Sequence, residues 1–454
     1  MPKVCVIGAG LSGSELVFQL SKVGVDVVLY EPRFEGKYSD GAHSTKKFAE
    51  LVCSNSLRSN KLHTAPGLLK EELRLLGSVL ISTADKNSIP AGDALAVSRD
   101  DFCEDITNKI LSLPNVQIIA EEVSDLKNLV KEFDAVCVCA GPLASKSISD
   151  SLKDLVGDDY LYFYDAIAPL VSAQSLDMDI CFKASRYGLP DATDGDYINC
   201  PMTKQQYYKF VEDLLNAQKA PLHEGDDGVF FRGCMPIEVM AQDAPETLLN
   251  GPMRGDGLVD PKKYTVPYAA VQLRQDNFSA SIYNVVGFQT RLTYKEQDRV
   301  FRTIPGLKNA EFLRSGSMHR NTFINTPKLL NQDMSLKVES KVFVAGQISG
   351  VEGYIESIAS AFYVAEGVVN RVLGKSFFKF PDVTAAGSLK RYLLQADSKN
   401  FQPMKINFGL LPELSLDDKK EFVGSGSRKH QTRLALSKRS IKVLTPFKNL
   451  VICT

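Results

Sequence analysis

The N-terminal residues have the hydrophobic pattern of a strand, a helix and a second strand. Lys3 to Ile7 is a short apolar run, which predicts a buried strand. Apolar positions then recur with helical spacing from Ser14 to Val23, and Asp26 to Tyr30 returns to a strand pattern. This order is typical of the first unit of a parallel α/β sheet.

Later segments continue the alternation. Strands are expected at Val116 to Ala120, Asp134 to Ala140 and Lys341 to Ala345, with a helix from Ile355 to Leu373. Between them lie a predicted helix, Lys204 to Asn216, and alternating strand patterns at Ala269 to Arg274 and Ala280 to Val286.

A glycine motif joins the first strand to the first helix. It reads Gly8-Ala9-Gly10-Leu11-Ser12-Gly13. In a strand–helix turn the first glycine allows the tight bend, the second lets the backbone approach a pyrophosphate, and the third lets helix and strand pack closely. Glu31 follows the second strand, where a carboxylate would bind a ribose hydroxyl. We therefore predict a dinucleotide site; the alternative is a purely structural glycine turn.

A second glycine-rich loop follows the strand at Lys341 to Ala345. It reads Gly346-Gln347-Ile348-Ser349-Gly350-Val351-Glu352-Gly353-Tyr354 and leads into a helix. In flavoproteins with two dinucleotide folds, such a helix directs its N-terminus at the flavin pyrimidine. Tyr354 is a candidate to stack on the isoalloxazine ring, and packing is the alternative. No second Gly-x-Gly-x-x-Gly is present, so no dedicated NAD(P)H site is visible.

Composition narrows the class of protein. The chain has 454 residues, 44% hydrophobic and 24% charged, with a formal net charge of −1. These values exclude disordered and fibrous chains. The near-zero charge means that a polyanionic partner must meet a local patch. One candidate patch is a basic run near the C-terminus; the alternative is a solvated tail. The run comprises Arg428, Lys429, Arg433, Lys438, Arg439, Lys442 and Lys448.

Cysteine usage and hydropathy indicate a cytoplasmic protein. Nine cysteines, an odd number, argue against a disulfide framework. No Cys-x-x-Cys or His-Glu-x-x-His pattern occurs, so no metal site is expected. No apolar run of about 18 residues predicts a membrane span, and the N-terminus lacks the features of a signal peptide.

Two cysteines stand in polar surroundings. Cys53 precedes Ser54-Asn55-Ser56, and Cys234 lies between Gly233 and a proline-containing turn. A thiol near basic groups can be held as a reactive thiolate. For both cysteines, packing in the core is the alternative.

The chain resembles the folate- and FAD-dependent tRNA (uracil-5-)-methyltransferases, the TrmFO family. The resemblance runs across nearly the whole sequence, in the family's order, in the segments VIGAGLSGSE, KFAELVCSNSLRS, GLLKEEL, CAGPLAS, YLYFYDA, FRGCMPIEVMA, PYAAVQLRQDN, NVVGFQTRLTY, IPGLKNAEFLR, MHRNTFINTPKLL, VAGQISGVEGYIES and FQPMKINFGLLPEL. The paralogous RlmFO branch, which methylates a uridine of large-subunit rRNA, is the alternative within this resemblance.

This resemblance implies a function and a set of site residues. The activity would be C5-methylation of a uridine, most simply the T-loop uridine of tRNA, using FAD, 5,10-methylenetetrahydrofolate and NADH or NADPH. Cys234 would attack uracil C6, and Cys53 would handle the one-carbon unit or donate a proton. The FAD-binding residues would be Gly8, Ala9, Gly10, Leu11, Ser12, Gly13, Glu31, Gly346, Gln347, Gly350, Val351, Glu352, Gly353 and Tyr354.

The resemblance also implies the fold: an α/β, Rossmann-type FAD-binding domain with an inserted α+β domain. We expect a first FAD-binding part at 1–94, an inserted region at 95–201, a continued FAD-binding part with substrate elements at 202–380, and a basic tail at 381–454. No membrane contact or obligate protein partner is expected. Other readings are a small-molecule FAD oxidoreductase, a flavin enzyme of the wobble uridine and a non-enzymatic RNA binder.

Overall fold

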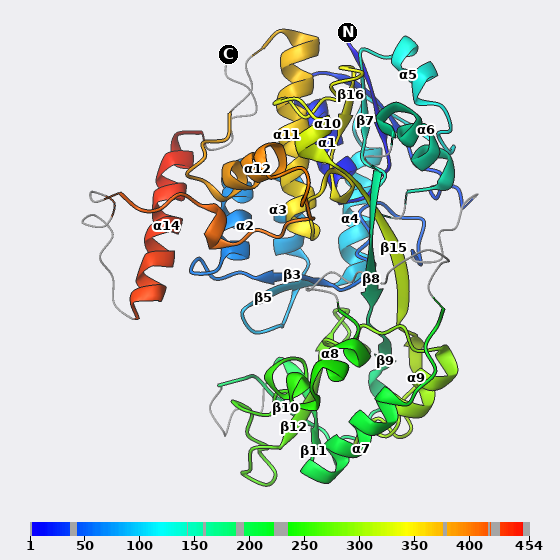
Figure 1. The fold of residues 1–454 in the computed structure, drawn as a ribbon, viewed down its shortest axis with the longest axis vertical. Coiled ribbons are helices and arrows are strands. Elements are labelled where there is room, and N and C mark those ends of the chain that lie inside the picture. Colours follow the sequence, from blue (N-terminus) through cyan, green and yellow to red (C-terminus); the bar gives the residue numbers. More distant parts are fainter. Residues whose placement is uncertain are drawn as a thin grey trace.

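The protein forms two bodies joined by a long ribbon of two strands (Figure 1). The computed structural model describes residues 2–36, 43–142, 144–157, 160–187, 195–221, 235–375, 379–415, 418 and 427–447, with the side chains of 160–167 and 318–320 left aside. The ribbon pairs β8 (Tyr160–Ile167) antiparallel with β15 (Ser317–Ile324).

The larger body is built on a five-stranded parallel sheet. Its strand order is β16-β7-β1-β2-β6, and all four pairings are parallel. The strands are β1 (Lys3–Ile7), β2 (Asp26–Tyr30), β6 (Val116–Ile119), β7 (Ala135–Val138) and β16 (Val342–Val344). A parallel sheet with helices on its faces requires apolar residues on both sides of its strands. The strands predicted for this sheet agree with the observed ones to within two residues at each end.

Helices cover this sheet, and two of them pack directly on each other. These are α1 (Leu11–Lys22) and α11 (Tyr354–Leu373). The other helices of this region are α3 (Val79–Lys86), α4 (Arg99–Leu111), α5 (Leu126–Glu132), α6 (Lys146–Val156) and α10 (Thr326–Leu329). The first helix begins three residues before the predicted start at Ser14, because Gly10 is its N-cap and the end of the glycine motif forms its first turn. Within the described residues no helix, α11 included, is long and apolar enough to span a bilayer.

The smaller body contains a six-stranded antiparallel sheet of order β10-β11-β12-β13-β9-β14. Its core is separate from that of the larger body and is rich in aromatic side chains, such as Tyr207, Phe210 and Phe288. Its elements are β9 (Leu170–Ser172), β10 (Phe182–Ala184), β11 (Tyr197–Met202), α7 (Lys204–Leu215), α8 (Ile237–Asp243), β12 (Ala269–Gln275), β13 (Ile282–Val285), α9 (Tyr294–Phe301) and β14 (Phe312–Arg314).

The two sheets place the domain boundaries elsewhere than the predicted segments 95–201 and 202–380. Both β6 and β7 pair within the parallel sheet, although the sequence reading assigned them to the insertion. The antiparallel sheet starts only after β8 and ends before β15. We therefore propose residues 168–316 as the inserted domain. Strand spacing did not reveal this division, because a strand's sheet depends on partners far away in sequence.

The segment expected as a basic tail folds onto the larger body. It contains α12 (Ala385–Gln395) and α14 (Arg428–Leu444), which both pack on α2 (Ala65–Leu75). Nearby, β3 (Ser56–Ser59), β5 (Ala94–Val97) and β4 (Ser88–Ile89) form a small antiparallel sheet. Short 3-10 turns complete the fold at Ala173–Ser175, Pro245–Asn250, Gln347–Ser349, Phe408–Leu410 and Thr445–Phe447.

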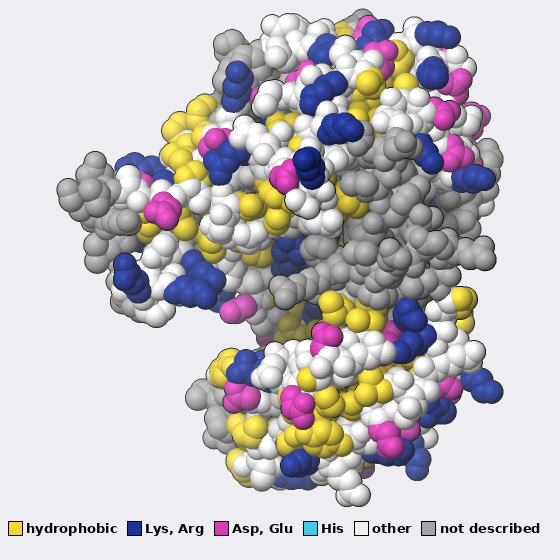
Figure 2. Space-filling model, in the orientation of Figure 1, with side chains coloured by type: hydrophobic (Ala, Val, Ile, Leu, Met, Phe, Trp, Pro, Cys, Tyr) yellow, Lys and Arg dark blue, Asp and Glu magenta, His cyan; other side chains and the backbone are white. Residues whose placement is uncertain are grey.

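The basic residues of α14 have two different roles. Arg439 is buried and donates to the carbonyls of Pro412 and Glu413, so it anchors the helix. Arg428, Lys429, Lys438 and Lys442 are exposed. Figure 2 shows Lys and Arg side chains on the surface over this helix.

A buried carboxylate holds the two C-terminal helices to α2. Glu72 accepts hydrogen bonds from the N–H groups of Ala385 (2.7 Å) and Ala386 (2.8 Å), at the start of α12, and from the Ser440 hydroxyl of α14. Burial raises its pKa to about 7. This pKa lies above that of Glu72 in the unfolded chain, roughly 4.3. The contribution of Glu72 to the stability of the fold is therefore fully present below about pH 4.3 and is lost as the pH rises through 7.

We expect Glu72→Ala to lower the free energy of unfolding by about 3 kcal/mol, since two buried N–H groups lose their acceptor. Glu71→Ala is the matched control, because Glu71 makes only a half-exposed ion pair with Arg74 and should cost at most about 1 kcal/mol. Denaturant unfolding at several pH values checks both. Equal losses for the two variants, or a Glu72→Ala protein with the pH dependence of the wild type, would contradict this assignment.

Candidate functional site

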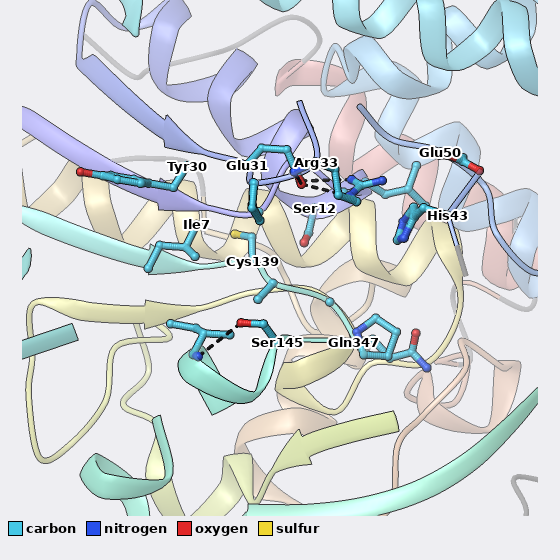
Figure 3. Close-up of a pocket in the computed structure, with 18 of the residues that line it drawn as sticks. Ile7, Ser12, Tyr30, Glu31, Arg33, His43, Glu50, Cys139, Ser145 and Gln347 are labelled. Atoms are coloured by element: carbon cyan, nitrogen blue, oxygen red, sulfur yellow. Dashed lines mark hydrogen bonds and ion pairs between the residues drawn. The ribbon is translucent and has the colours of Figure 1, made fainter. Parts of the chain in front are cut away.

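A cleft that is partly open to solvent lies at the carboxyl ends of β1, β2 and β7. In parallel α/β sheets ligands bind outside this edge. The segments that meet there include the glycine motif, the Cys139–Pro142 turn and the loop before α11. Figure 3 shows Ser12, Glu31 and Arg33 on one side of the cleft and Ser145 and Gln347 on the other.

The glycine motif has the geometry expected of a phosphate turn. Gly8 has φ +95°, and a side chain on Gly13 would put its Cβ 1.9 Å from the Gly8 carbonyl oxygen. A Cβ on Gly10, in contrast, would meet no atom within 4 Å. Gly10, Leu11 and Ser12 line the cleft, so the N-terminal end of α1 faces it. Such an end offers free N–H groups and a positive dipole to a phosphate.

Glu31 lies in the cleft but is paired within the protein. Its carboxylate accepts from the Ala9 N–H (2.9 Å) and from Nε (3.0 Å) and Nη2 (3.1 Å) of Arg33. Both side chains are buried, and Nη1 of Arg33 has no hydrogen-bond partner among the described residues. The sequence analysis predicted Glu31 as a site residue but did not identify Arg33. The spacing Glu-x-Arg directly after the second strand could have indicated that these two side chains pair.

Only some of the residues predicted to bind FAD in the loop before α11 line the cleft. Gln347 and Tyr354 line the cleft. Gly350 instead lies against the Phe401 ring, and Glu352 forms an ion pair with Lys405 at 2.9 Å. Val351 is buried, bridged to Met404, and Gly346 adjoins Ser12. The loop therefore packs against chain segments that the sequence pattern did not connect to it.

A turn between residues 43 and 50 closes another side of the cleft. Glu50 accepts four hydrogen bonds of 2.7 to 2.9 Å from the N–H and hydroxyl groups of Ser44 and Thr45. Burial acts against ionisation, but these bonds lower the pKa of Glu50 below its usual range. His43 and Glu50 both line the cleft.

Cys53 lies beside the cleft, on a loop held by Tyr354. The Tyr354 hydroxyl accepts hydrogen bonds from the N–H groups of Cys53 (2.8 Å) and Ser54 (3.1 Å). Cys53 is half-buried, whereas the other described cysteines are buried. Since Tyr354 also lines the cleft, a residue 301 positions away fixes the Cys53 backbone next to it.

The inserted domain holds the same loop from the opposite side. Asn55, fully buried, donates to the carbonyl oxygens of Val97 (3.0 Å) and Gln275 (2.8 Å) and accepts from Arg274 Nε (2.9 Å). Arg274 Nη2 also donates to the Ser54 hydroxyl at 2.5 Å. The Cys53 loop is therefore part of the contact between the two domains.

A buried ion pair reinforces this contact. Arg99 of α4 binds Asp276 through Nε (3.1 Å) and Nη2 (2.9 Å) and donates to the carbonyl oxygens of Leu51 and Val52. Both charged side chains are almost fully buried. Removing one partner of such a pair typically costs about 3 to 5 kcal/mol.

Other cysteines behave as core residues. Burial raises the pKa of Cys103 and Cys139 to about 12 in each case, and it raises the pKa of Cys137 well above its ordinary value. Cys137 and Cys139 are buried at the end of β7. Cys234 and Lys448 lie outside the described residues. Within the described part of the chain, no group of three or more His, Cys, Asp or Glu side chains could hold a metal ion.

The parallel sheet, the glycine turn and the cleft at the strand ends define a Rossmann-type dinucleotide-binding protein. A family profile described as glucose inhibited division protein A matches residues 3–376. The solved structure of Aquifex aeolicus GidA, form II crystal, is 16% identical, covers 99% of this chain and 74% of that chain, and superposes with a TM-score of 0.68. This likeness supports the Rossmann-type α/β fold.

Closer relatives carry a more specific name. The Bacillus subtilis (strain 168) methylenetetrahydrofolate--tRNA-(uracil-5-)-methyltransferase TrmFO is 50% identical over 420 residues, 92% of this chain and 94% of that protein. The protein of the same name from Lactobacillus gasseri is 46% identical over 446 residues, 98% of each chain. The chain belongs to the TrmFO family.

Two glycine variants separate folding from phosphate binding. We expect Gly10→Ala to fold normally and to bind FAD at least roughly tenfold more weakly, because its methyl group would occupy open cleft next to the phosphate path. Gly13→Ala should instead lower Tm, since its Cβ collides with the backbone at Gly8. Flavin titration and thermal unfolding measure the two effects. Full FAD affinity in folded Gly10→Ala would refute this placement of the phosphates.

The role of Tyr354 is testable through the reactivity of Cys53. Tyr354→Phe removes the acceptor of two N–H groups, so we expect alkylation of Cys53 by iodoacetamide to become about tenfold faster. Peptide mass spectrometry identifies the modified cysteine. Tyr363→Phe is the control, because this tyrosine lies on the same helix and its hydroxyl donates to Ala386. An unchanged Cys53 rate would mean that Tyr354 does not hold the loop.

Proposed function

We propose that this protein methylates C5 of a uridine in tRNA, using 5,10-methylenetetrahydrofolate, FAD and a nicotinamide nucleotide as reductant. The observation that carries the proposal is that Tyr354 lines the dinucleotide cleft and also binds the N–H of Cys53. A candidate reactive thiol thus adjoins the cofactor cleft. The TrmFO relatives, 46% to 50% identical over almost the whole chain, supply the choice of substrate.

The cleft fits FAD in its chemistry. Open space at Gly10 and the α1 N-terminus suit a pyrophosphate, and the unpartnered Arg33 Nη1 beside Glu31 suits the polar part of a nucleotide. The residues that hold FAD are then Gly8, Gly10, Leu11, Ser12, Glu31 and Arg33 on one side and Gln347 and Tyr354 on the other. When bound and reduced, FAD supplies the hydride and the means of carrying the one-carbon unit.

The two cysteines supply covalent catalysis. Uracil C5 is a poor nucleophile, but addition of a thiolate at C6 converts C5 into an enolate carbon. Cys234 is the proposed nucleophile, and Cys53 handles the one-carbon unit or the C5 proton. Tyr354, Asn55 and Arg274 hold the Cys53 loop in place, so that its thiol does not have to be ordered at each turnover.

RNA binding requires both phosphate contacts and an extruded base. A flipped uridine loses stacking at a cost of a few kcal/mol, which phosphate contacts offset. The exposed basic residues of α14, namely Arg428, Lys429, Lys438 and Lys442, suit such contacts. Arg439 does not, because its guanidinium is bound to backbone carbonyls.

Methyl transfer to purified unmodified RNA tests the proposal. We expect 5-methyluridine in tRNA, dependent on folate and on NADH or NADPH, and a loss of at least roughly 10³-fold in Cys53→Ala and Cys234→Ala. Cys103→Ala, a buried cysteine of α4, is the control and should retain activity. Transfer to large-subunit rRNA alone would redirect the proposal to the other branch, and full activity of Cys234→Ala would exclude the covalent step.

A further inference from the structure

An ion pair stands at the N-terminal end of α11, the helix whose first turn borders the dinucleotide cleft. Tyr354 and Ser357 of that turn line the cleft. Glu356, in the same turn, is fully buried and binds the guanidinium of Arg58, a residue of β3. The pair therefore joins the helix beside the cofactor cleft to the strand that follows the Cys53 loop.

Both charged groups lie against Gly353, the N-cap residue of α11. A Cβ on Gly353 would be 2.5 Å from Glu356 Oε2 and 3.7 Å from Arg58 Nη2. Glu356 Oε1 also accepts a hydrogen bond from the Ile406 N–H at 2.9 Å, whereas Oε2 has no hydrogen-bond partner among the described residues. The pair thus places one negative and one positive charge at the end of the helix that borders the cleft.

Tertiary contacts impose the conformation of Arg58. Its φ is +62°, in the left-handed region that long side chains rarely adopt. The fully buried Lys70 of α2 donates to three consecutive carbonyl oxygens, those of Leu57 (2.8 Å), Arg58 (3.3 Å) and Ser59 (2.7 Å). Helix α2 therefore fixes the backbone on both sides of Arg58. Strained residues that the surrounding structure holds in place cluster at functional sites.

We propose that the Arg58–Glu356 pair sets the reduction potential of bound FAD, by fixing the charge that the N-terminal end of α11 presents to the flavin. This inference rests on the proposed function for its cofactor, and both are positioning residues that act through the helix. In flavoproteins of this fold the corresponding helix end faces the flavin pyrimidine. The other carboxylate of this loop, Glu352, is paired with Lys405 at 2.9 Å. Glu356 by itself would oppose negative charge on the flavin, and Arg58 cancels that effect.

The charge matters because hydride transfer from the nicotinamide nucleotide changes the charge of the flavin. A hydride carries two electrons and one proton, so its transfer oxidises the nicotinamide and leaves the flavin ring with one added negative charge. A nearby carboxylate disfavours that product, and a nearby guanidinium favours it. The two members of the pair therefore act on the reduction in opposite directions and nearly cancel when both are present.

Single and double variants of the FAD-loaded protein test this cancellation. Glu356→Gln leaves the Arg58 charge unopposed and is expected to raise the reduction potential, whereas Arg58→Gln leaves the carboxylate unopposed and is expected to lower it. We expect each to change the ratio of affinities for reduced and oxidised FAD roughly five- to tenfold, about 20 to 30 mV for a two-electron couple. The double variant should return to within roughly twofold of the wild-type ratio. Titration against a redox dye of known potential, at one pH, measures all four proteins.

Arg371→Gln is the matched control, because this arginine lies at the far end of α11, is paired with Asp333 at 3.1 Å, and should leave the potential unchanged. If the wild type binds no flavin, the proposed function fails and this inference with it. If FAD binds but both single variants shift the affinity ratio less than roughly twofold, about 9 mV, or in the same direction, the pair only anchors the helix and this inference alone fails.

A charge-conserving variant separates charge from packing. Arg58→Lys keeps the positive charge, so it should retain the wild-type potential even if its Tm falls. A shift as large as that of Arg58→Gln would mean that charge is not the cause. If Arg58→Gln proves unstable by its Tm, Glu356→Gln decides, and an unchanged or lower potential in that variant would overturn the assignment.

Discussion

The attachment of the Cys53 loop to both domains is the constraint on which the rest of the site depends. Tyr354 binds the loop from the dinucleotide-binding body, and Arg274 and Asn55 bind it to the inserted domain. These hydrogen bonds are buried or part-buried, so losing one leaves a polar group with little access to water and without its partner. A small change in the angle between the domains would therefore move the thiol relative to the cofactor cleft.

The parallel sheet provides the fixed reference for this arrangement. Five strands end at one edge, and the glycine motif, the Cys139–Pro142 turn and the loop before α11 all follow strands of that sheet. Since α1 and α11 pack on each other, the N-termini of both helices face the same cleft. The Glu31–Arg33 pair shows that this cleft is also organised electrostatically: a carboxylate expected to bind a ribose is held in place by a neighbouring guanidinium.

The two domains contribute different chemistry to the site. The dinucleotide-binding body offers backbone N–H groups, a helix N-terminus and Tyr354. The inserted domain adds the positive charge of Arg274, from β12, which binds Ser54 and Asn55. This charge reaches the Cys53 loop because the two domains meet there. The C-terminal helix α14, anchored through Glu72 and Arg439, adds a basic surface to the body that binds the nucleotide.

Local sequence determined the elements and the cofactor motif. The strand and helix ranges and the tight turn at Gly8 follow from short-range patterns, because periodicity and turn chemistry act over a few residues. The TrmFO family was indicated by the resemblance of segments along nearly the whole chain. Tertiary structure decided the rest. Only folding showed that β6 and β7 belong to the first sheet, that Arg33 pairs with Glu31, and that Arg274 binds Ser54, 220 positions away. The reason is that burial and charge pairing depend on which surfaces meet in space, and a linear pattern carries no record of that.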